Sequence, residues 1–392
     1  MTPPIQRPAL ELAEVVRRHG HRLGELCGEH QRILRAIASC RTAALGGHVQ
    51  TCDNCQYQRI AYNSCRNRHC PRCQAHACAQ WMENRAQELL PVEYFHVVFT
   101  LPSTLNALAL ANKRVVYGVL FDAVAQTLSE VAANPRHLGA RIGFIAILHT
   151  WGQNLSLHPH LHCVIPGGGL SPDGSQWIGC RPGFFLPVRV LSKVFRGKFI
   201  DLLKRARAAG RLLGVECNRD FNRLLNASVK HDWVVYAKPP FGGPEQVLKY
   251  LSRYTHRIAI SNRRLAAIDD QTVTFNYKDY AHGNRPRTMT LDGAEFLRRF
   301  LLHAVPSGFM RIRHFGLLAN RCRGENLAAC RRLLSVPDSL ASGPTPTPPA
   351  APSPAGSSTH ACCPACGRGR LIPGPHLSPL QLSRLTIRLD SS

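Results

Sequence analysis

The sequence is poor in acidic side chains. Its 392 residues include 49 Lys and Arg but only 24 Asp and Glu, which gives a formal net charge of +25 at pH 7. Carboxylates are therefore too scarce to favour a catalytic site built from an acidic triad. The positive field attracts polyanions and speeds their capture, so nucleic acid is the first partner that the composition indicates.

Long apolar runs and targeting signals are also lacking. The most apolar region, residues 95–130, is interrupted by Pro102, Asn106, Lys113 and Arg114, so no run approaches the length that crosses a bilayer. The N-terminus shows no apolar stretch followed by a small-residue cleavage site. No GxxxxGK loop for a nucleotide phosphate occurs either. These absences argue against secretion, membrane insertion and ATP-driven chemistry, and we expect a cytoplasmic, nucleoid-associated protein.

Hydrophobic periodicity predicts a mixed α+β chain. Apolar positions at helical spacing predict two short helices within residues 8–41. Further along, runs rich in β-branched and aromatic residues predict strands, with helical patterns between them. The expected strands are 94–102, 141–150, 156–166, 232–238, 257–261, 272–278 and 286–291, and the expected helices are 109–132, 191–209, 218–229 and 244–255. Because strands and helices do not alternate strictly, we expect a mainly antiparallel sheet with flanking helices.

Composition divides the chain into four segments. Residues 1–90 form a helical and cysteine-rich region, and residues 91–335 form the main α+β domain. Residues 336–358 are rich in Pro, Ser and Ala without apolar periodicity, which is typical of a flexible linker. Residues 359–392 form a basic tail with one more cysteine group.

Paired cysteines in the first segment predict a metal site rather than disulfides. The chain has 16 cysteines and no export signal. Cys52 and Cys55 form one CxxC pair and Cys70 and Cys73 a second, with 14 residues between the pairs. Two such knuckles can surround a Zn²⁺ ion with four thiolates. A closed four-ligand site leaves no position for a substrate, so the zinc should be structural.

Residues near the two CxxC pairs include alternative zinc ligands and several arginines. Cys65 is an alternative ligand, and His69, His76 and Cys78 are further substitutes. Arginines around the knuckles predict a rigid basic surface for contacts with DNA phosphates. These arginines are Arg59, Arg66, Arg68 and Arg72.

The tail offers a partial metal site. Cys363 and Cys366 form one knuckle, with His360 and His376 as candidate partners. Two cysteines supply only half of the ligands of a zinc site. The tail could therefore form a small zinc-binding element or have no regular structure, and the sequence leaves both alternatives open. The preceding linker suggests that the main domain does not depend on it.

Three histidines share one face of the strand SLHPHLHCVIPGGG. Side chains at i and i+2 point the same way, so His160 and His162 converge from one side of the sheet. Two neutral imidazoles leave several coordination positions open, as a catalytic divalent ion requires. His158, Gln153 and His149 are candidates for the third protein ligand. Half-buried histidines with a purely structural role are the alternative.

A second element supplies candidate nucleophiles. Tyr250 and Tyr254 lie four residues apart on the expected helix 244–255, so both hydroxyls project from one face. Packing is the alternative for such a pair. Phenol has a pKa near 10, so attack on a phosphodiester requires nearby positive charge. Basic residues in this helix and directly after it supply it, namely Lys249, Arg253 and Arg257.

Together these motifs resemble a known family. The strand HPHLHCVI, followed by YLSRYTHR, resembles the HUH superfamily of single-strand DNA nucleases. The upstream blocks NSCRNRHCPRCQ and FHVVFTLP narrow the resemblance to rolling-circle insertion-sequence transposases of the IS91 type. The resemblance covers residues 10–335. Because the chain has both tyrosines, it resembles the two-tyrosine branch of this family.

The resemblance implies a function and its site residues. Residues 91–335 would be an HUH-type catalytic domain, in which His160 and His162 hold Mg²⁺ or Mn²⁺. Tyr250 and Tyr254 would attack single-stranded DNA at the element ends and form 5′-phosphotyrosine intermediates. The zinc-binding region would serve DNA recognition.

Two other functions remain open at this point. A plasmid replication initiator or relaxase of the same superfamily would share the histidine strand and the tyrosines, although the zinc block argues against it. A zinc-dependent DNA-binding regulator without chemistry would be indifferent to the loss of both tyrosines.

Overall fold

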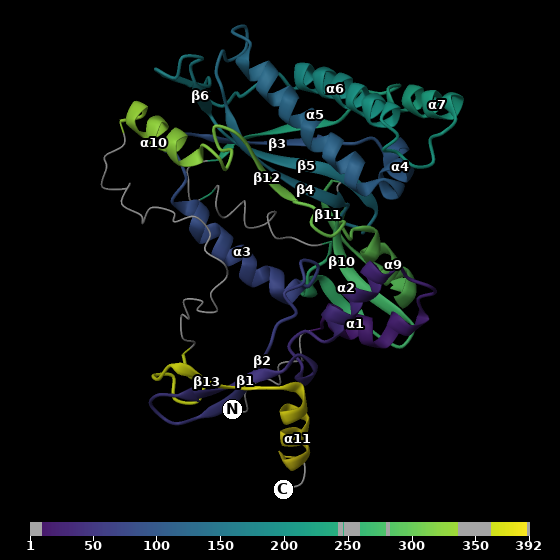
Figure 1. Ribbon diagram of the computed structural model, residues 1–392, viewed down its shortest axis with the longest axis vertical. Helices are drawn as coiled ribbons and strands as arrows, with labels where there is room; N and C mark the ends of the chain where they lie inside the picture. The colour runs from purple at the N-terminus through teal and green to yellow at the C-terminus, as the bar shows by residue number, and fades with distance from the viewer. Residues whose placement is uncertain (1–9, 242–245, 247–258, 280–282, 336–361, 390–392) are drawn as a thin grey trace.

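A five-stranded antiparallel sheet forms the centre of the protein (Figure 1). The computed structural model describes residues 10–241, 246, 259–279, 283–335 and 362–389. Within them, the strand order of the central sheet is β12-β4-β5-β3-β8, and each neighbouring pair is antiparallel. Its strands are β3 (Tyr94–Thr100), β4 (Gly143–Trp151), β5 (Leu157–Pro166), β8 (Val235–Phe241) and β12 (Ile312–Gly316). The expected mainly antiparallel sheet is confirmed.

Helices cover one face of this sheet. Inward-facing residues of β5, such as Leu161 and Ile165, are fully buried against Phe121 and Phe195 of the helical layer. Burial of such a continuous apolar layer supplies most of the stability of the domain. The layer consists of α4 (Asn106–Ala111), α5 (Lys113–Ala133), α6 (Val188–Ala208) and α7 (Asn218–Ser228). In Figure 1, α5 and α6 lie side by side over the sheet. Beside it, β6 (Gly168–Leu170) and β7 (Trp177–Gly179) form a two-stranded ribbon.

Helix α5 is long and apolar enough, by length and composition, to cross a membrane. This differs from the expectation that no run reaches that length. However, 61% of its most apolar window is buried inside the protein. Tyr117, Leu120 and Val124 belong to the main hydrophobic core. The apolar character of α5 is therefore that of a core helix.

The opposite face of the sheet is covered only in part. Ile145, Ile147 and Val164 of the sheet pack against Leu327 and Cys330 of α10 (Arg323–Leu333). Toward the far ends of β4 and β5, this face carries histidines instead of aliphatic residues. The change from apolar to imidazole side chains marks the candidate site.

A second hydrophobic core brings the N-terminal helices together with residues 259–304. Helices α1 (Leu12–His19) and α2 (Gly28–Ala38) pack on α9 (Gly293–Leu302) and on a three-stranded sheet. That sheet contains β9 (Leu265–Ile268), β10 (Thr272–Asp279) and β11 (Arg285–Asp292), in the order β11-β10-β9. Trp151 and Leu155, next to the histidine strand, also belong to this core. The N-terminal helices thus brace the main domain.

One expected strand is wrong. Residues 259–261 of the expected strand 257–261 form no strand, and the remaining residues lie outside the described part. Ala259 and Ile260 are buried in the second core, so their apolar character reflects packing rather than sheet pairing. The strand in this region is β9, which begins at Leu265.

A fourth, small sheet lies at the far end of the molecule (Figure 1). Its order is β13-β1-β2, with all pairs antiparallel. It contains β1 (Gly47–Cys52), β2 (Gln58–Tyr62) and β13 (Leu371–Leu377), and is followed by α11 (Pro379–Leu389). Helix α3 (Pro71–Ala86) runs from the region of α1 and α2 toward α10 (Figure 1). The C-terminal segment therefore returns to the N-terminal hairpin.

Candidate functional site

The pairing register of the central sheet gathers histidines on one face. In an antiparallel pair, residues directly opposite each other share a face. His149 of β4 lies opposite His160 of β5, and two residues further along β5 His162 lies on the same face. On the other side, β3 places His96 opposite Val164, diagonal to His162. Three strands thus contribute imidazoles to one patch.

His149, His160 and His162 form a group that can hold a metal ion. One nitrogen from each ring lies within 4.8 Å of the others. The ring centroids of His149 and His162 are 4.4 Å apart, and those of His160 and His162 are 4.8 Å apart. Three imidazoles on one side of an ion leave its remaining positions open for phosphate oxygens and water. The donor set and its convergence therefore fit a divalent cation. We call these three residues the histidine cluster.

Hydrogen bonds orient two of these rings. The Nδ1 atom of His160 lies 2.6 Å from the carbonyl oxygen of His158, which only accepts, so Nδ1 carries the proton. Nε2 of His160 is then left with its lone pair for a metal. Nδ1 of His162 lies 2.8 Å from Nε2 of His96, and the two rings are stacked. Such outer partners set the tautomer and direction of a metal-binding histidine.

Burial keeps the imidazoles of His160 and His96 neutral. Desolvation lowers the pKa of His160 to about 4, with the nearby His158 ring as a smaller cause. Desolvation likewise lowers the pKa of His96 to about 3, helped by Lys238. A neutral imidazole has the free lone pair that coordination needs. The ring of His160 is therefore in the ligand form at physiological pH.

The structure places the three candidates for the third ligand differently. His149 joins the pair. His158 lies on the same face but is exposed, and its carbonyl group orients His160. Gln153 lies in the loop before β5, and its backbone carbonyl group accepts a hydrogen bond from the side chain of Arg264. His96 was missed by the sequence reasoning, because its contact with His162 depends on the pairing of β3 with β5.

Replacing His96 with leucine is expected to weaken metal binding at the histidine cluster by about 10–100-fold, because the ring of His162 loses its partner. Leucine fills a similar volume, so the sheet should stay folded. Titration of the purified protein with Mn²⁺, followed by calorimetry, measures the change. His137→Gln, an exposed site on another segment, is the matched control. Equal Mn²⁺ affinity in His96→Leu and wild type would contradict the orienting role.

The candidate nucleophiles and the basic residues near them fall outside the described part of the chain. These are Tyr250 and Tyr254 together with Lys249, Arg253 and Arg257.

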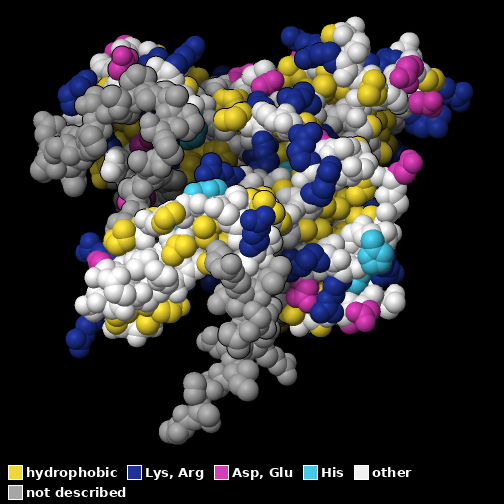
Figure 2. All heavy atoms as spheres, turned by 60° about the horizontal axis from the view of Figure 1, so that its bottom comes forward, with side chains coloured by type: hydrophobic (Ala, Val, Ile, Leu, Met, Phe, Trp, Pro, Cys, Tyr) yellow, Lys and Arg dark blue, Asp and Glu magenta, His cyan; other side chains and the backbone are white. Residues whose placement is uncertain are grey.

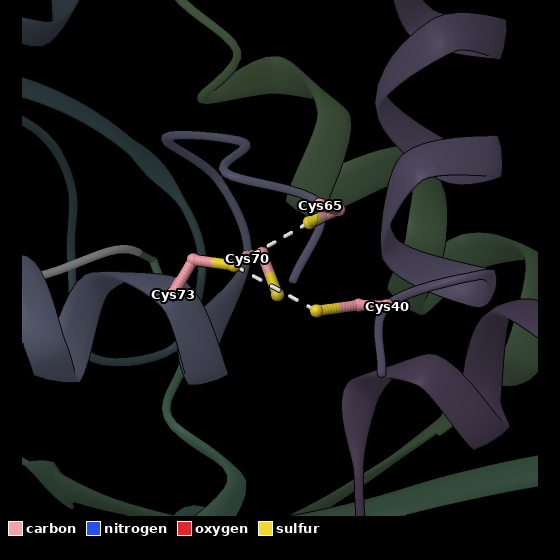
Figure 3. Close-up of side chains that lie close together, drawn as sticks. All are labelled: Cys40, Cys65, Cys70 and Cys73. Carbon is pink, nitrogen blue, oxygen red and sulfur yellow. Dashed lines mark hydrogen bonds between the residues drawn. The ribbon is translucent and has the colours of Figure 1, made fainter. Parts of the chain in front are cut away.

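Four cysteines near the N-terminus form the first thiol cluster: Cys40, Cys65, Cys70 and Cys73 (Figure 3). Cys40 follows α2, Cys65 lies in the loop after β2, and Cys70 and Cys73 lie at the start of α3. The Sγ atom of Cys73 is 3.7 Å from that of Cys40 and 3.5 Å from that of Cys65. A tetrahedral zinc site with Zn–S bonds of about 2.3 Å places its sulfurs about 3.8 Å apart. The cluster fits zinc.

The local environment lowers the pKa of one thiol in this cluster and raises the pKa of two others, Cys40 and Cys65. The hydrogen bond from Cys65 lowers the pKa of Cys70 to about 5. Burial raises the pKa of Cys40 to about 11, so this thiol resists ionisation without a cation. A bound zinc ion supplies the positive charge that lets all four sulfurs become thiolates.

The expected cage of Cys52, Cys55, Cys70 and Cys73 is wrong in its pairing. Cys52 ends β1 and Cys55 lies in the turn before β2, so both lie at the tip of the hairpin. Cys70 and Cys73 lie beyond its base. The length of β1 alone is about 17 Å at about 3.4 Å per residue, which keeps the two pairs apart. The candidate Cys65 does join Cys70 and Cys73, and Cys40 completes that set.

Cys52 and Cys55 instead belong to the second thiol cluster, with Cys363 and Cys366. Of the two alternatives left open for the tail, this grouping agrees with a small zinc element, but the partners of Cys363 and Cys366 are cysteines of the hairpin and not histidines. His376, a candidate partner there, pairs with His48 in the sheet, and its Nε2 atom lies 3.3 Å from Nδ2 of Asn63. His360 lies outside the described residues.

The arginines around the cysteines divide into internal and exposed groups. Arg68 donates two hydrogen bonds, of 2.6 and 2.8 Å, to the carbonyl oxygen of Phe309. Arg72 pairs with Glu11, its Nε atom lying 2.8 Å from the carboxylate. Arg66 is exposed. The first two arginines thus hold the zinc region to the rest of the protein.

Exposed basic residues line a groove of about 690 Å³ along the small sheet. Its lining includes Arg41, Arg59, Arg66 and the half-exposed Tyr62. Arg41 and Arg66 have positive φ angles of 56° and 50°, which cost a non-glycine residue of order 1–3 kcal/mol and are typical of functional sites. Figure 2 shows Lys and Arg side chains spread over the face it draws, with fewer acidic ones. The groove suits an anionic polymer.

Two family models match the chain. One, described as a transposase zinc-binding domain, matches residues 12–101, and the other, described as a putative transposase, matches residues 143–326. The first range contains the first thiol cluster, and the second contains the histidine cluster. The two models together define the class, a transposase that carries a zinc-binding domain.

Relatives narrow this class to one family. The chain is 53% identical over 386 residues to the putative transposase y4qJ of Sinorhizobium fredii, covering 94% of this chain and 96% of the relative. It is 30% identical over 326 residues to the transposase for insertion sequence element IS801 of Pseudomonas savastanoi pv. phaseolicola, covering 79% and 74%. The chain belongs to the IS91-type family of insertion-sequence transposases.

Solved structures of a conjugative relaxase, TrwC, are also similar. The metal-bound complex with oriT DNA has a TM-score of 0.25 and 15% identity, covering 62% of this chain and 72% of the relaxase chain. The metal-free complex has a TM-score of 0.24 and 16% identity, covering 62% and 73%.

Proposed function

We propose that this transposase cleaves and rejoins single-stranded DNA at the ends of its insertion sequence through 5′-phosphotyrosine intermediates. Tyr250 and Tyr254 are the nucleophiles, and the histidine cluster holds the divalent ion. The observation that carries the proposal is the convergence of His149, His160 and His162 in a member of a transposase family. A divalent ion there would polarise the phosphate and stabilise charge on the leaving oxygen.

The chain's own groups account for the chemistry. A tyrosine hydroxyl attacks the scissile phosphorus and loses its proton, the bond to the 3′ oxygen breaks, and a 3′ hydroxyl leaves. The phosphotyrosine bond conserves the energy of the broken phosphodiester, so rejoining to another 3′ hydroxyl requires no ATP. The second tyrosine permits another cleavage while the first strand stays attached. The basic residues Lys249, Arg253 and Arg257 are close to both tyrosines in the sequence, and their charges would stabilise the phenolate.

The donor atoms of the histidine cluster favour one of the two expected divalent ions over the other. The histidine cluster offers three imidazole nitrogens. Mg²⁺ prefers oxygen ligands, whereas imidazole suits transition metals. Of the two catalytic ions expected from the sequence, we therefore propose that Mn²⁺ supports activity at lower concentration than Mg²⁺.

DNA recognition is assigned to the small sheet. Arg41, Arg59 and Arg66 contact phosphates along the groove, and Tyr62 offers a ring for base stacking. Arg68 and Arg72, which have internal partners, position this surface instead. A structural zinc ion in the first thiol cluster keeps the surface rigid. A protein with this partner acts in the cytoplasm at the nucleoid.

The experiment is incubation with labelled single-stranded DNA carrying an element end, in the presence of Mn²⁺. Wild type should form a covalent protein–DNA adduct that survives denaturing electrophoresis. Tyr250→Phe combined with Tyr254→Phe should form none, because phenylalanine has no hydroxyl nucleophile. Tyr57→Phe, an exposed tyrosine in the hairpin turn, is the matched control and should react as wild type does. An adduct of equal yield in the double variant would refute the proposed chemistry.

A further inference from the structure

We propose that Cys52, Cys55, Cys363 and Cys366 bind a second structural zinc ion that fastens the C-terminal segment 362–389 to the N-terminal hairpin. This proposal goes beyond the transposase chemistry, because it concerns how the two ends of the chain are held. The family model for the zinc-binding domain ends at residue 101, before two of these four cysteines. No nuclease step depends on it.

The sulfur positions fit a tetrahedral ion. The Sγ atoms of Cys52 and Cys366 are 3.8 Å apart, and those of Cys55 and Cys363 are 3.7 Å apart. Zn–S bonds of about 2.3 Å place sulfurs about 3.8 Å apart in a tetrahedron. Each contact joins one cysteine of the hairpin to one of the tail. The ion would therefore cross-link two segments that are 314 positions apart in the sequence.

Backbone amides around the sulfurs form two knuckles. The amides of Asn54 and Cys55 each lie 3.4 Å from the sulfur of Cys52. The amide of Gly369 lies 3.3 Å from the sulfur of Cys366. Amides that point at sulfur stabilise a thiolate, which is the form that binds metal. Both CxxC turns thus have the local geometry of zinc ligands.

Gly369 shows how closely the tail approaches the hairpin. A Cβ atom at this position would lie 2.3 Å from the sulfur of Cys52 and 2.7 Å from the Cβ atom of Asn54. Only glycine leaves room for the sulfur. The next residue completes the junction, because the amide of Arg370 donates to the Asp53 carboxylate at 2.7 Å.

The cluster continues directly into the sheet. Cys52 lies opposite Leu371 in the pairing of β1 with β13, and the ladder runs on to Gly47 and Leu377. A hairpin of two strands is marginally stable in water, and a third strand is needed for independent stability. Zinc at the tip fixes the register of the third strand. The tail therefore completes the sheet whose other strands line the basic groove.

The test is the zinc content of the purified full-length protein, measured by plasma mass spectrometry. Wild type should contain two zinc ions per chain. Cys363→Ser combined with Cys366→Ser should contain one, retained by the first thiol cluster. Cys362→Ser, an exposed cysteine adjacent to the knuckle and outside the cluster, is the matched control and should keep two. One zinc ion in wild type, or two in the double variant, would overturn the proposal.

A second measurement separates loss of the metal from loss of the fold. A specific protease site is inserted into the Pro- and Ser-rich stretch at residues 336–358 and cut after purification. The C-terminal fragment should remain bound to the N-terminal part on size exclusion and separate on addition of a zinc chelator. Gly369→Ala should release the fragment without a chelator, although it retains every cysteine. A fragment that separates from the cut wild type before chelation would refute the clamp.

Discussion

Replacing His160 and His162 together with asparagine is expected to lower the rate of DNA cleavage by at least about a thousand-fold. Both side chains lie in the histidine cluster, and neither has a substitute on β5 at the same depth. Loss of the divalent ion removes several kcal/mol of charge stabilisation in the transition state, and each 1.36 kcal/mol corresponds to about a tenfold change in rate. The cleavage rate of a labelled oligonucleotide under single-turnover conditions measures the effect.

DNA binding provides the internal control for this variant. The basic groove lies on the small sheet, so its affinity for the oligonucleotide should remain near that of wild type. Asparagine keeps a polar side chain at two largely buried positions, and a thermal melt reports whether the sheet is intact. His137→Gln should cleave at the wild-type rate. A folded double variant that still cleaves at a tenth of that rate or faster would exclude the histidine cluster as the catalytic metal site.

Replacing Cys70 with serine is expected to unfold the zinc region. Cys70 is 2% exposed, contributes to the second hydrophobic core and immediately precedes α3. Structural zinc contributes an apparent binding energy of about 10–16 kcal/mol, which equals or exceeds the whole stability of a typical domain. The variant should lose one zinc ion per chain and the region around α1, α2 and α3 should become sensitive to protease.

Comparison with an exposed cysteine isolates the effect of the metal. Cys27→Ser, at an exposed position outside both thiol clusters, should keep its zinc and its protease resistance. Protease digestion followed by mass spectrometry identifies the segments that open. The second thiol cluster shares no ligand with the first, so its zinc should remain at early time points. Full zinc content and wild-type resistance in Cys70→Ser would contradict a structural zinc in the first thiol cluster.

Local pattern was sufficient to predict much of the histidine cluster. The period of two along a strand places His160 and His162 on one face without knowledge of the fold. His149 was already a candidate because β4 and β5 are consecutive, and consecutive strands usually pair. The position of His96 could not be predicted in this way. Its strand is separated from β5 by α4, α5 and β4, and its contact follows only from the non-local register of β3 with β5.

The cysteine ligands show the limit of spacing rules more clearly. CxxC spacing correctly identifies each knuckle, because both sulfurs come from one turn. It does not state which knuckles meet. The hairpin β1–β2 separates Cys52 from Cys70, and the strand β13 brings Cys363 across the length of the chain. Cys40 has no CxxC partner at all, so only the fold, which brings its sulfur within 3.7 Å of that of Cys73, could reveal it.

The return of the tail to the hairpin has a consequence for the timing of synthesis. Cys52 and Cys55 leave the ribosome early, but Cys366 follows 314 positions after Cys52. At about 5–20 residues per second, that interval is on the order of 15–60 s. During this time the hairpin tip carries two thiols without their partners, while the first thiol cluster is already complete. The small sheet, to which we assign DNA recognition, would therefore mature only after the last residues of the chain have been made.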